Sequence, residues 1–471
     1  MSGTGSDTTP RVLIASAFGN VPGSGGGLFA VAGSRAERVD HISSVGLAYG
    51  ERHLARAFHC RGEDATIAEI VIYDERGVKR YMRLDDAASV HDIAWDGENL
   101  VVVSTWDNAV RWFAPSGQLM HEVRYTGPLD SWHINCVTQR DGEWFATMFG
   151  PVGPFGCSPS AREGAGRLVR LTTGEEVVGG LTGPHTPRWL DDLWLVCNSA
   201  TGELVAVDES SGRVARRVAC GPWTRGIAWD DERMYVGTSC RRTEQGAVGN
   251  GEIVVLDRNT WAIEERISVP AQEIYDLALV SQALLGGLRR GFDVNPRRAA
   301  EFRQHRLIFE MGVDEPRSLW PSGDPLPWND FRCTIACTVP TTCEGGTIVH
   351  VPLRLTNRSK SFFTSAPPAP VYVSYKWTDP LNGALLTDAR AYRSRLPRTM
   401  LPGESIDMTA HVVVPPGAGH AKLRITALQE GVAWFDDQDP ASAIDFAVDI
   451  TPAGPTVWKP TVRCRPDRGG R

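Results

Sequence analysis

A pattern that recurs six times constrains what this 471-residue chain can fold into. Each copy consists of a small or polar residue, two or three apolar residues, a turn rich in Gly and Asp, and a second apolar stretch. The turns contain pairs such as Asp96-Gly97 and Asp141-Gly142, which tolerate the backbone angles of a tight hairpin. Each copy therefore predicts two strands joined by a hairpin. The copies begin near Gly46, Asp92, Asn135, Pro187, Gly226 and Asp276.

The spacing of these copies, at 46, 43, 52, 39 and 50 residues, indicates the architecture. Two more short strands follow each pair, for example in residues 203–218. Four strands repeated every ~40–50 residues are typical of the blade of a β-propeller. We predict an all-β fold with a six-bladed β-propeller over residues 11–290, after a disordered N-terminus at residues 1–10. The strands RVLIASAF and GLFAVAG are expected to complete the sixth blade, whose inner pair of strands runs from Asp276 to Leu288.

The pattern stops after residue 290. Residues 291–330 are rich in Arg and Pro and predict a linker with a short helix around Pro296–His305. Residues 331–451 return to short strands of alternating polarity separated by turn signals such as Asn382-Gly383. Such a run predicts an immunoglobulin-like β-sandwich. The remaining residues, 452–471, are rich in Pro, Arg and Gly and predict a flexible tail.

Charge and composition exclude several classes of protein. The chain has 49 Lys and Arg against 56 Asp and Glu, a net charge of −7, which disfavours a nucleic-acid-binding protein. No apolar run is long enough for a membrane span, and the N-terminus does not resemble a signal peptide. The ten cysteines are scattered, as expected for free thiols in a reducing compartment. We therefore expect a cytoplasmic protein.

The residues just before each inner strand should meet at one rim of the propeller channel. Three of the eleven histidines, His91, His133 and His185, fall at this position in successive copies. Loops at the end of a scaffold often carry binding residues, and three long loops, at 19–27, 149–166 and 238–250, are expected at this rim. Asp276 joins the histidines as a candidate catalytic residue. The candidate ligand-binding residues are Asp92, Trp132, Asn135, Arg188, Trp223, Arg225 and Tyr275.

Several roles fit a rim of this composition. The imidazoles of His91, His133 and His185 could hold a divalent metal ion that activates water, with a nearby carboxylate as a further ligand or hydrogen-bond acceptor. One histidine could instead act as a general base. The same groups could bind ligand hydroxyls while Trp132 and Trp223 stack on the apolar face of a sugar. The structural alternative is that each histidine only bonds a backbone group of a neighbouring blade.

Five segments carry a resemblance to a known family. HDIAWDGENLVVVSTWDN, WHINCVTQRDGEWFATMFG, GPHTPRWLDDLWLVCNSATGELVAVD, WTRGIAWDDERMYVG and VPAQEIYDLALV resemble a bacterial six-bladed β-propeller family of unknown function. The resemblance covers roughly residues 11–290, and its most specific part is PHTPRWLDDLWL. It implies a propeller fold and no particular activity.

The C-terminal part resembles a different module. The segments YKWTDPLNG and LPRTMLPGESIDMTAHVVVPPGAGHAKLRITALQEGVAWFDDQ look like a sandwich appended to bacterial glycosyltransferases, methyltransferases and polysaccharide-export components. This resemblance implies a glycan or secondary-metabolite pathway. The main hypothesis is a protein that binds, and could process, a saccharide-like ligand at the histidine rim. The alternatives are a metal-dependent hydrolase or lyase and a non-catalytic scaffold that docks glycan-assembly enzymes through the sandwich.

Overall fold

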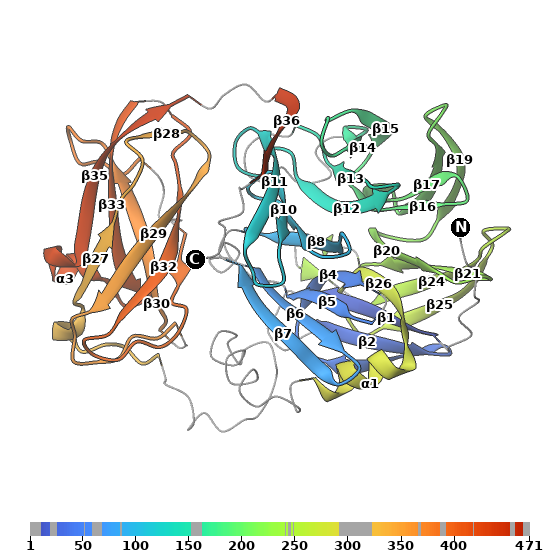
Figure 1. Cartoon of the computed structure of the whole chain (residues 1–471), viewed down its shortest axis with the longest axis horizontal. Helices are drawn as coiled ribbons and strands as arrows, with labels where there is room; N and C mark the ends of the chain where they lie inside the picture. The colour runs from blue at the N-terminus through green and yellow to red at the C-terminus, as the bar shows by residue number, and fades with distance from the viewer. Residues whose placement is uncertain are drawn as a thin grey trace.

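The computed structural model shows a chain of antiparallel sheets with very little helix (Figure 1). The described residues are 11–18, 26–50, 52–58, 68–84, 87–151, 163–240, 242–243, 246–247, 249–291, 323–365, 369–386, 392–417, 419–452 and 457–464. Within these ranges no helix is long and apolar enough to cross a membrane. The helix expected around Pro296–His305 lies outside the described residues.

Apart from one small hairpin, the described strands up to Ser281 form six antiparallel sheets of four strands each. In five of them the strands follow the order of the chain, and the sixth begins with the last of these strands and continues with the first three. Sheet 1 contains β4 (Ser44–Tyr49), β5 (Leu54–Phe58), β6 (Ala68–Asp74) and β7 (Gly77–Leu84). Sheet 2 contains β8 (Val90–Trp95), β9 (Leu100–Ser104), β10 (Ala109–Phe113) and β11 (Leu119–Thr126). Sheet 3 contains β12 (Ile134–Arg140), β13 (Glu143–Met148), β14 (Gly166–Arg170) and β15 (Glu176–Leu181).

The next three sheets repeat this order. Sheet 4 contains β16 (Pro184–Leu190), β17 (Leu193–Asn198), β18 (Glu203–Asp208) and β19 (Arg213–Ala219). Sheet 5 contains β20 (Thr224–Trp229), β21 (Arg233–Thr238), β24 (Gly251–Asp257) and β25 (Ile263–Val269). The small hairpin of β22 (Arg242–Thr243) and β23 (Gly246–Ala247) lies between β21 and β24 in the chain. Sheet 6 contains β26 (Glu273–Ser281), β1 (Arg11–Phe18), β2 (Gly27–Ala32) and β3 (Arg35–Asp40).

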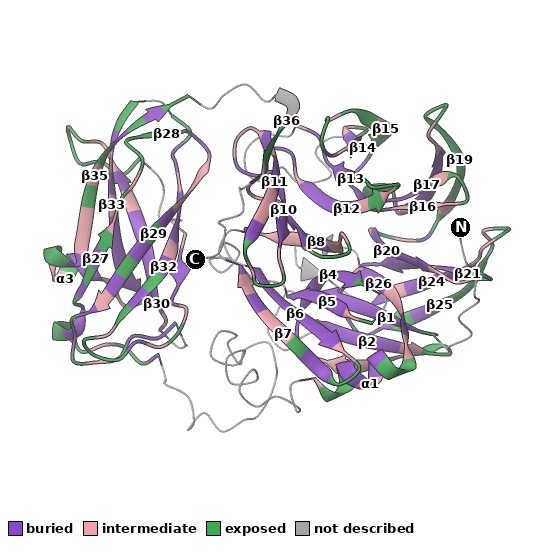
Figure 2. Ribbon diagram, viewed as in Figure 1, coloured by how far each residue is buried: buried purple, intermediate pink, exposed green. Residues whose placement is uncertain are grey.

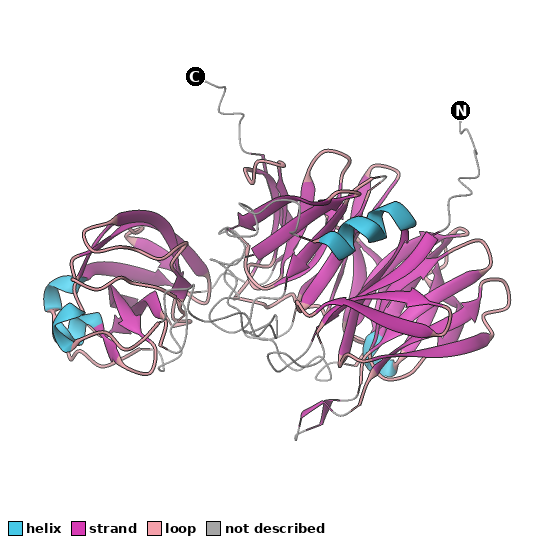
Figure 3. Cartoon of the chain, turned by 90° about the horizontal axis from the view of Figure 1, so that it is seen from below, coloured by secondary structure: helices cyan, strands magenta, loops and turns pink. Residues whose placement is uncertain are grey.

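The innermost strand of each sheet contacts the innermost strands of the two neighbouring sheets. The contacts run from β4 to β8, β12, β16, β20 and β26, and β26 contacts β4 again. They close a ring, around which Figures 1 and 3 show the sheets side by side. Apolar side chains fill the space between sheets, as where Val45 of sheet 1 and Ile93 of sheet 2 share one buried cluster. Figure 2 shows that the outer strands β19 and β25 are mostly exposed. This all-β arrangement is consistent with a propeller.

The closure of the ring differs from the sequence prediction. Strand β26 pairs with β1, and the expected second strand is instead helix α1 (Gln282–Arg290). Ser281 caps this helix, because its side chain accepts a hydrogen bond from the N–H group of Leu284. Leu284, Leu285 and Leu288 are buried on one face of α1, a helical spacing that the sequence prediction missed. Three N-terminal strands, β1 to β3, therefore complete sheet 6 where two were expected.

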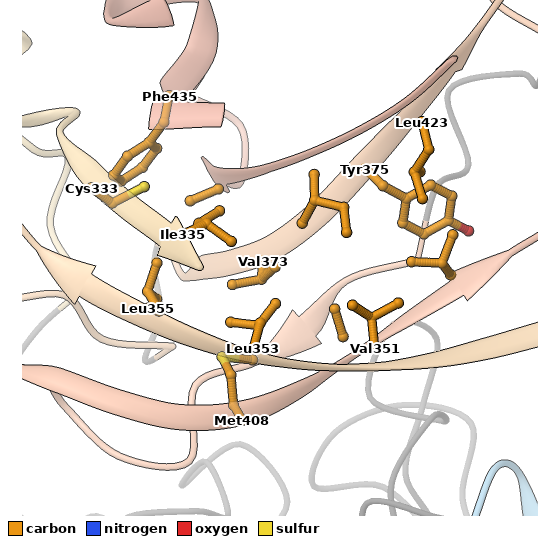
Figure 4. Close-up of a cluster of buried hydrophobic side chains, with 14 of the residues drawn as sticks. Cys333, Ile335, Val351, Leu353, Leu355, Val373, Tyr375, Met408, Leu423 and Phe435 are labelled. Carbon is orange, nitrogen blue, oxygen red and sulfur yellow. The ribbon is translucent and has the colours of Figure 1, made fainter. Parts of the chain in front are cut away.

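The chain beyond residue 322 forms two further sheets. The first contains β27 (Cys333–Cys337), β29 (Ile348–Asn357) and β32 (Ser405–Val413). The second contains β28 (Thr342–Glu344), β30 (Val371–Thr378), β31 (Ser394–Arg395), β33 (Gly419–Gln429), β34 (Ala433–Trp434) and β35 (Ala443–Thr451), with the short helix α3 (Phe435–Gln438) beside β33. Both sheets contribute to one buried cluster, in which Figure 4 shows Leu353 of the first and Val373 of the second.

The C-terminal tail also differs from the prediction. Residues Val457–Cys464 form strand β36, which pairs antiparallel with β11 and makes sheet 2 five-stranded. The segment after β11 also contacts the turn between β28 and β29, since the N–H group of Leu129 donates to the carbonyl oxygen of Gly346 at 2.6 Å. The flexible tail predicted at 452–471 is therefore wrong for the residues of β36. Composition missed this strand because its partner lies in the first third of the chain.

Removal of residues 452–471 is expected to uncover the outer edge of β11. Amide groups of β11 that β36 protects should exchange with deuterium faster, whereas β9, in the middle of the same sheet, should keep its protection. Hydrogen–deuterium exchange of the full and truncated chains, read on peptides that cover 119–126 and 100–104, measures this difference. Equal exchange of residues 119–126 in both chains would contradict the pairing of β36 with β11.

Candidate functional site

The innermost strands share an irregularity at the same place in each sheet. A bulge adds a residue to one strand and changes the direction in which its side chains point. Two consecutive side chains can then face the same side, whereas those of an unbroken strand alternate between faces. The pairing shifts lie between Ser44 and Leu47, Val90 and Ile93, Ile134 and Cys136, His185 and Arg188, Arg225 and Ile227, and Ile274 and Asp276.

These bulges bring consecutive residues to one cavity at the centre of the ring of sheets. Four consecutive pairs line it: His91-Asp92, Asn135-Cys136, His185-Thr186 and Tyr275-Asp276. Gly46, Arg188 and Arg225 complete the lining, so that all six sheets contribute. The volume open to the centre of a water molecule is about 10 Å³, which is room for about one ordered water. The cavity itself therefore accepts one small chemical group.

Aromatic side chains surround this cavity. The ring centroids of His91 and His133 lie 5.2 Å apart, and His133 stacks on Phe149 at 4.2 Å. Phe149 lies 5.5 Å from His185, and His185 lies 6.1 Å from Trp223. The guanidinium of Arg225 lies 5.8 Å from the ring of Trp223 and 4.2 Å from the ring of Tyr275. The ring of Tyr275 lies 6.3 Å from that of His91, which closes the circle. We call this set the rim ring: His91, His133, Phe149, His185, Trp223, Arg225 and Tyr275.

Three residues of the site have backbone angles that residues other than Gly rarely adopt. The φ angles are 44° at His133, 49° at Thr186 and 50° at Trp223. A β-branched residue such as Thr186 is especially unfavourable in this region. Strained residues of this kind persist only where the surrounding structure holds them, and they are frequent at functional sites.

Asp92 and Asp276 connect neighbouring sheets within the cavity wall. One oxygen of Asp92 accepts the N–H group of Val137 at 3.0 Å, and one oxygen of Asp276 accepts that of Leu47 at 3.2 Å. The other oxygen of each carboxyl group accepts the N–H group of the next residue in its own strand. Asp276 also lies 3.5 Å from the guanidinium of Arg188. Both carboxyl groups are thus engaged in holding the innermost strands together.

The same two carboxyl groups have perturbed acidities. Burial, reinforced by the nearby Asp276, raises the pKa of Asp92 to about 8, although Arg188 and two backbone N–H groups oppose the shift. Burial also raises the pKa of Asp276, against the charge of Arg188. Asp92 is therefore largely protonated and uncharged near neutral pH.

Two histidines of the rim ring are held in the same way. The Nδ1 atom of His185 lies 3.0 Å from the carbonyl oxygen of Gly183 and 2.8 Å from the hydroxyl of Ser199. The Nδ1 atom of His91 lies 3.0 Å from the hydroxyl of Thr105. Burial, followed by the positive charge of Arg225, holds the pKa of His185 well below its usual value, so this imidazole is neutral.

Three residues of the cavity wall each have a buried polar atom without a hydrogen-bond partner among the described residues. These atoms are Nδ2 of Asn135, Nε2 of His185 and Nε of Arg225. The three residues are 0%, 2% and 5% exposed. Buried polar groups in proteins are almost always paired, so atoms of this kind call for an explanation such as an ordered water molecule or a bound group.

The structure brings most predicted rim residues together, but it assigns Trp132 elsewhere. His91, Asp92, Asn135, His185, Arg188, Arg225, Tyr275 and Asp276 line the cavity, and His133 and Trp223 belong to the rim ring. Trp132 is fully buried, packs on Tyr125 at 5.2 Å and donates its indole N–H group to the carbonyl oxygen of Thr126. It therefore belongs to the core between sheets, and its prediction as a ligand-binding residue is wrong.

The predicted three-histidine metal site is not formed. No group of three or more His, Cys, Asp or Glu side chains in the described parts of the chain is placed to hold a metal ion. The physical reason is Phe149, whose ring lies between those of His133 and His185.

Phe149 is the rim residue that sequence reasoning missed. It follows the end of β13 directly, as Thr105 follows β9, Ser199 follows β17 and Ser239 follows β21. An alignment of the repeats at this position would have placed Phe149 beside the histidines. Of the three long loops expected at the rim, residues 19–25 and 152–162 lie outside the described residues, as do 241, 244–245 and 248.

Comparisons with known proteins name no activity for this chain. The model of a domain of unknown function, DUF4915, matches residues 64–284. None of the curated proteins matches the chain. The matched segment runs from β6 of sheet 1 to β26 of sheet 6.

Solved structures with a similar arrangement are distant in sequence. They include the nidogen/laminin complex, with 9% identity, a TM-score of 0.41, and coverage of 57% of this chain and 98% of that one. AztD from Citrobacter koseri has 14% identity, a TM-score of 0.30 and coverage of 57% and 98%. Sqt1 from Saccharomyces cerevisiae has 11% identity, a TM-score of 0.32 and coverage of 50% and 76%.

Proposed function

We propose that this protein binds a neutral, saccharide-like ligand at the rim ring, with one hydroxyl group of the ligand in the central cavity. In this proposal the six sheets are the blades of a six-bladed β-propeller, and the two C-terminal sheets are an immunoglobulin-like sandwich. The sandwich's resemblance to modules of bacterial glycan enzymes supports a ligand from a glycan or secondary-metabolite pathway.

The observation that carries the proposal is the set of three unpartnered polar atoms in the cavity wall, on Asn135, His185 and Arg225. An apolar ligand would leave these atoms unpaired, at a cost of about 1–3 kcal/mol each. A hydroxyl group is small enough for the cavity and can both donate and accept hydrogen bonds. The aromatic faces of the rim ring suit the apolar C–H faces of the sugar to which that hydroxyl belongs.

The charge balance of the site supports a neutral ligand. Arg225 is paired with the carboxylate of Glu273 at 3.2 Å, and both groups are buried. The imidazole of His185 is neutral because its pKa is lowered, and Asp92 is mostly protonated because its pKa is raised. The other guanidinium group of the cavity wall, that of Arg188, lies 3.5 Å from the carboxyl group of Asp276. Each guanidinium group of the wall thus already faces a carboxyl group of the protein, which disfavours a carboxylate or a phosphate as ligand.

Binding is better supported than catalysis. The four carboxyl oxygens of Asp92 and Asp276 already accept backbone N–H groups, which leaves Asp276 poorly placed to act as a nucleophile or proton donor. The low pKa of His185 also makes its imidazole a weak base near neutral pH. The rim therefore provides hydrogen-bonding and stacking groups that are held in place.

Replacement of Trp223 by Ala is expected to weaken binding of a neutral monosaccharide at least tenfold, because it removes an aromatic face of the rim ring. The measurement is calorimetry or ligand-observed NMR with a panel of neutral hexoses and the corresponding uronic acids. Trp328→Ala is the control, since Trp328 is 63% exposed and lies outside the rim ring. Tighter binding of uronic acids than of hexoses, or equal loss in both variants, would refute the proposal.

A further inference from the structure

Hydroxyl side chains link neighbouring sheets at equivalent positions around the ring. Ser16 donates to the carbonyl oxygen of Val45 at 2.5 Å, and Thr105 donates to that of Ile134 at 2.7 Å. The hydroxyl of Ser199 donates to the carbonyl oxygen of Thr224 at 2.5 Å, and that of Ser239 donates to Ile274 at 3.5 Å. Each of these bonds joins the second strand of one sheet, or the residue directly after it, to the innermost strand of the next sheet, so the link itself is a structural feature.

The hydroxyl at this position in sheet 4, that of Ser199, has a second role. A carbonyl oxygen can only accept, so the single proton of the Ser199 hydroxyl is used by Thr224, and Ser199 accepts a hydrogen bond from Nδ1 of His185. The carbonyl oxygen of Gly183, 3.0 Å from the same Nδ1 atom, also requires a donor there. Both neighbours therefore favour the tautomer of His185 with its proton on Nδ1.

A neutral imidazole with its proton on Nδ1 has a bare lone pair on Nε2. In His185 this Nε2 atom is buried, and no described residue donates to it. The other two unpartnered atoms of the cavity wall are hydrogen-bond donors. Nε of Arg225 always carries a proton. Oδ1 of Asn135 accepts a hydrogen bond from Thr147 at 2.6 Å, so the unpartnered atom of this amide is its Nδ2 donor. The residues that line this small cavity therefore carry two donors and one acceptor without a partner among the described residues.

We propose that this cavity selects a hydroxyl group, which donates to Nε2 of His185 and accepts from Asn135 and Arg225, and that Ser199 is the positioning residue that fixes the tautomer of His185. The inference rests on the proposed function for the identity of the whole ligand, but the tautomer is a property of the protein alone. A carboxylate or a ketone has no proton to donate, so it would leave His185 unpaired. The site therefore distinguishes ligand groups that can donate a hydrogen bond from groups that can only accept one.

The test is ¹⁵N NMR of the imidazole nitrogens in the full chain at pH 7. The expected result is a protonated Nδ1 and a bare Nε2 in His185, and a shift of the Nε2 resonance with ethylene glycol but not with acetate. Protonation of Nε2, or a larger shift with acetate, would overturn the inference. The NMR result does not depend on whether any saccharide binds. Failure of the proposed function would be seen separately, as the absence of binding by every sugar in the panel.

Three variants test the role of Ser199. Ser199→Ala is expected to move the Nε2 resonance toward the average of the two tautomers and to reduce the ethylene glycol shift at least threefold. Ser199→Thr, which keeps the hydroxyl, should restore both signals. Ser239→Ala removes the equivalent link from sheet 5, which has no histidine bonded to that hydroxyl among the described residues, and should leave His185 unchanged. If Ser199→Ala and Ser239→Ala changed the Nε2 resonance of His185 and its ethylene glycol shift equally, the hydroxyl of Ser199 would act only on stability. That result would overturn its role as a positioning residue.

Discussion

Replacement of Gly46 by Ala is expected to lower the free energy of unfolding by about 3 kcal/mol, the upper end of the range for overpacked sites. A Cβ atom on Gly46 would lie 2.6 Å from the backbone nitrogen of Ile93 and 2.8 Å from Cα of Asp92. These are backbone atoms of the neighbouring innermost strand, so they cannot move away without separating β4 from β8. Chemical denaturation of the two proteins measures the difference.

Gly50→Ala is the matched control, because Gly50 directly follows the same strand. A Cβ atom there meets its nearest neighbour, Cδ1 of Trp95, at 3.8 Å, which is ordinary contact. The control should therefore change stability by less than about 1 kcal/mol. If Gly46→Ala and Gly50→Ala melt alike, the innermost strands do not approach as closely as the ring of sheets requires. A similar close approach holds at Gly226, whose Cβ would lie 3.0 Å from the backbone of Asp276.

The repeated pattern predicted the position of the innermost strands. Gly46, Asp92, Asn135, Pro187, Gly226 and Asp276 all lie within those strands, in sheets 1 to 6 respectively. The prediction succeeded because local signals determine these hairpins: a turn of Asp and Gly flanked by apolar residues. The convergence of His91 and His185 on one cavity followed from their shared place in the repeat.

Other features depend on contacts that the sequence pattern does not show. Strand β36 pairs with a strand far away in the chain, and its composition resembles that of an unstructured tail. Helix α1 replaces an expected strand because Leu284, Leu285 and Leu288 pack at a helical spacing against the core. The bulges change which side chains reach the cavity, and so Cys136 and Thr186 line it although neither was a candidate.

The metal hypothesis failed for a related reason. Sequence spacing placed three histidines at one rim, but it could not show that the ring of Phe149 lies between two of them. Coordination needs several lone pairs directed at one point, which a count of ligand residues does not establish.

Asp92 is expected to make the protein less stable as the pH rises toward 8. Its pKa is raised from an ordinary value near 4 to about 8 by burial and by Asp276, so the folded state holds a proton that the unfolded state has released. Stability therefore falls with increasing pH between these two values and levels off above the folded-state pKa. The slope is up to about 1.4 kcal/mol per pH unit. Below about pH 6.5 the lowered pKa of His185 acts in the opposite direction, so the Asp92 effect is clearest between pH 6.5 and 8.

The measurement is the free energy of unfolding of the wild type and of Asp92→Ala at several pH values from 6.5 to 9. The variant leaves the N–H group of Val137 without its acceptor, so it should be less stable at every pH, but its slope between pH 6.5 and 8 should be close to zero. Asp231→Ala, at an exposed turn, is the control and should keep the wild-type slope. A slope in Asp92→Ala that equals the wild-type slope would mean that another group holds the proton, and that Asp92 is ionised within the cavity wall.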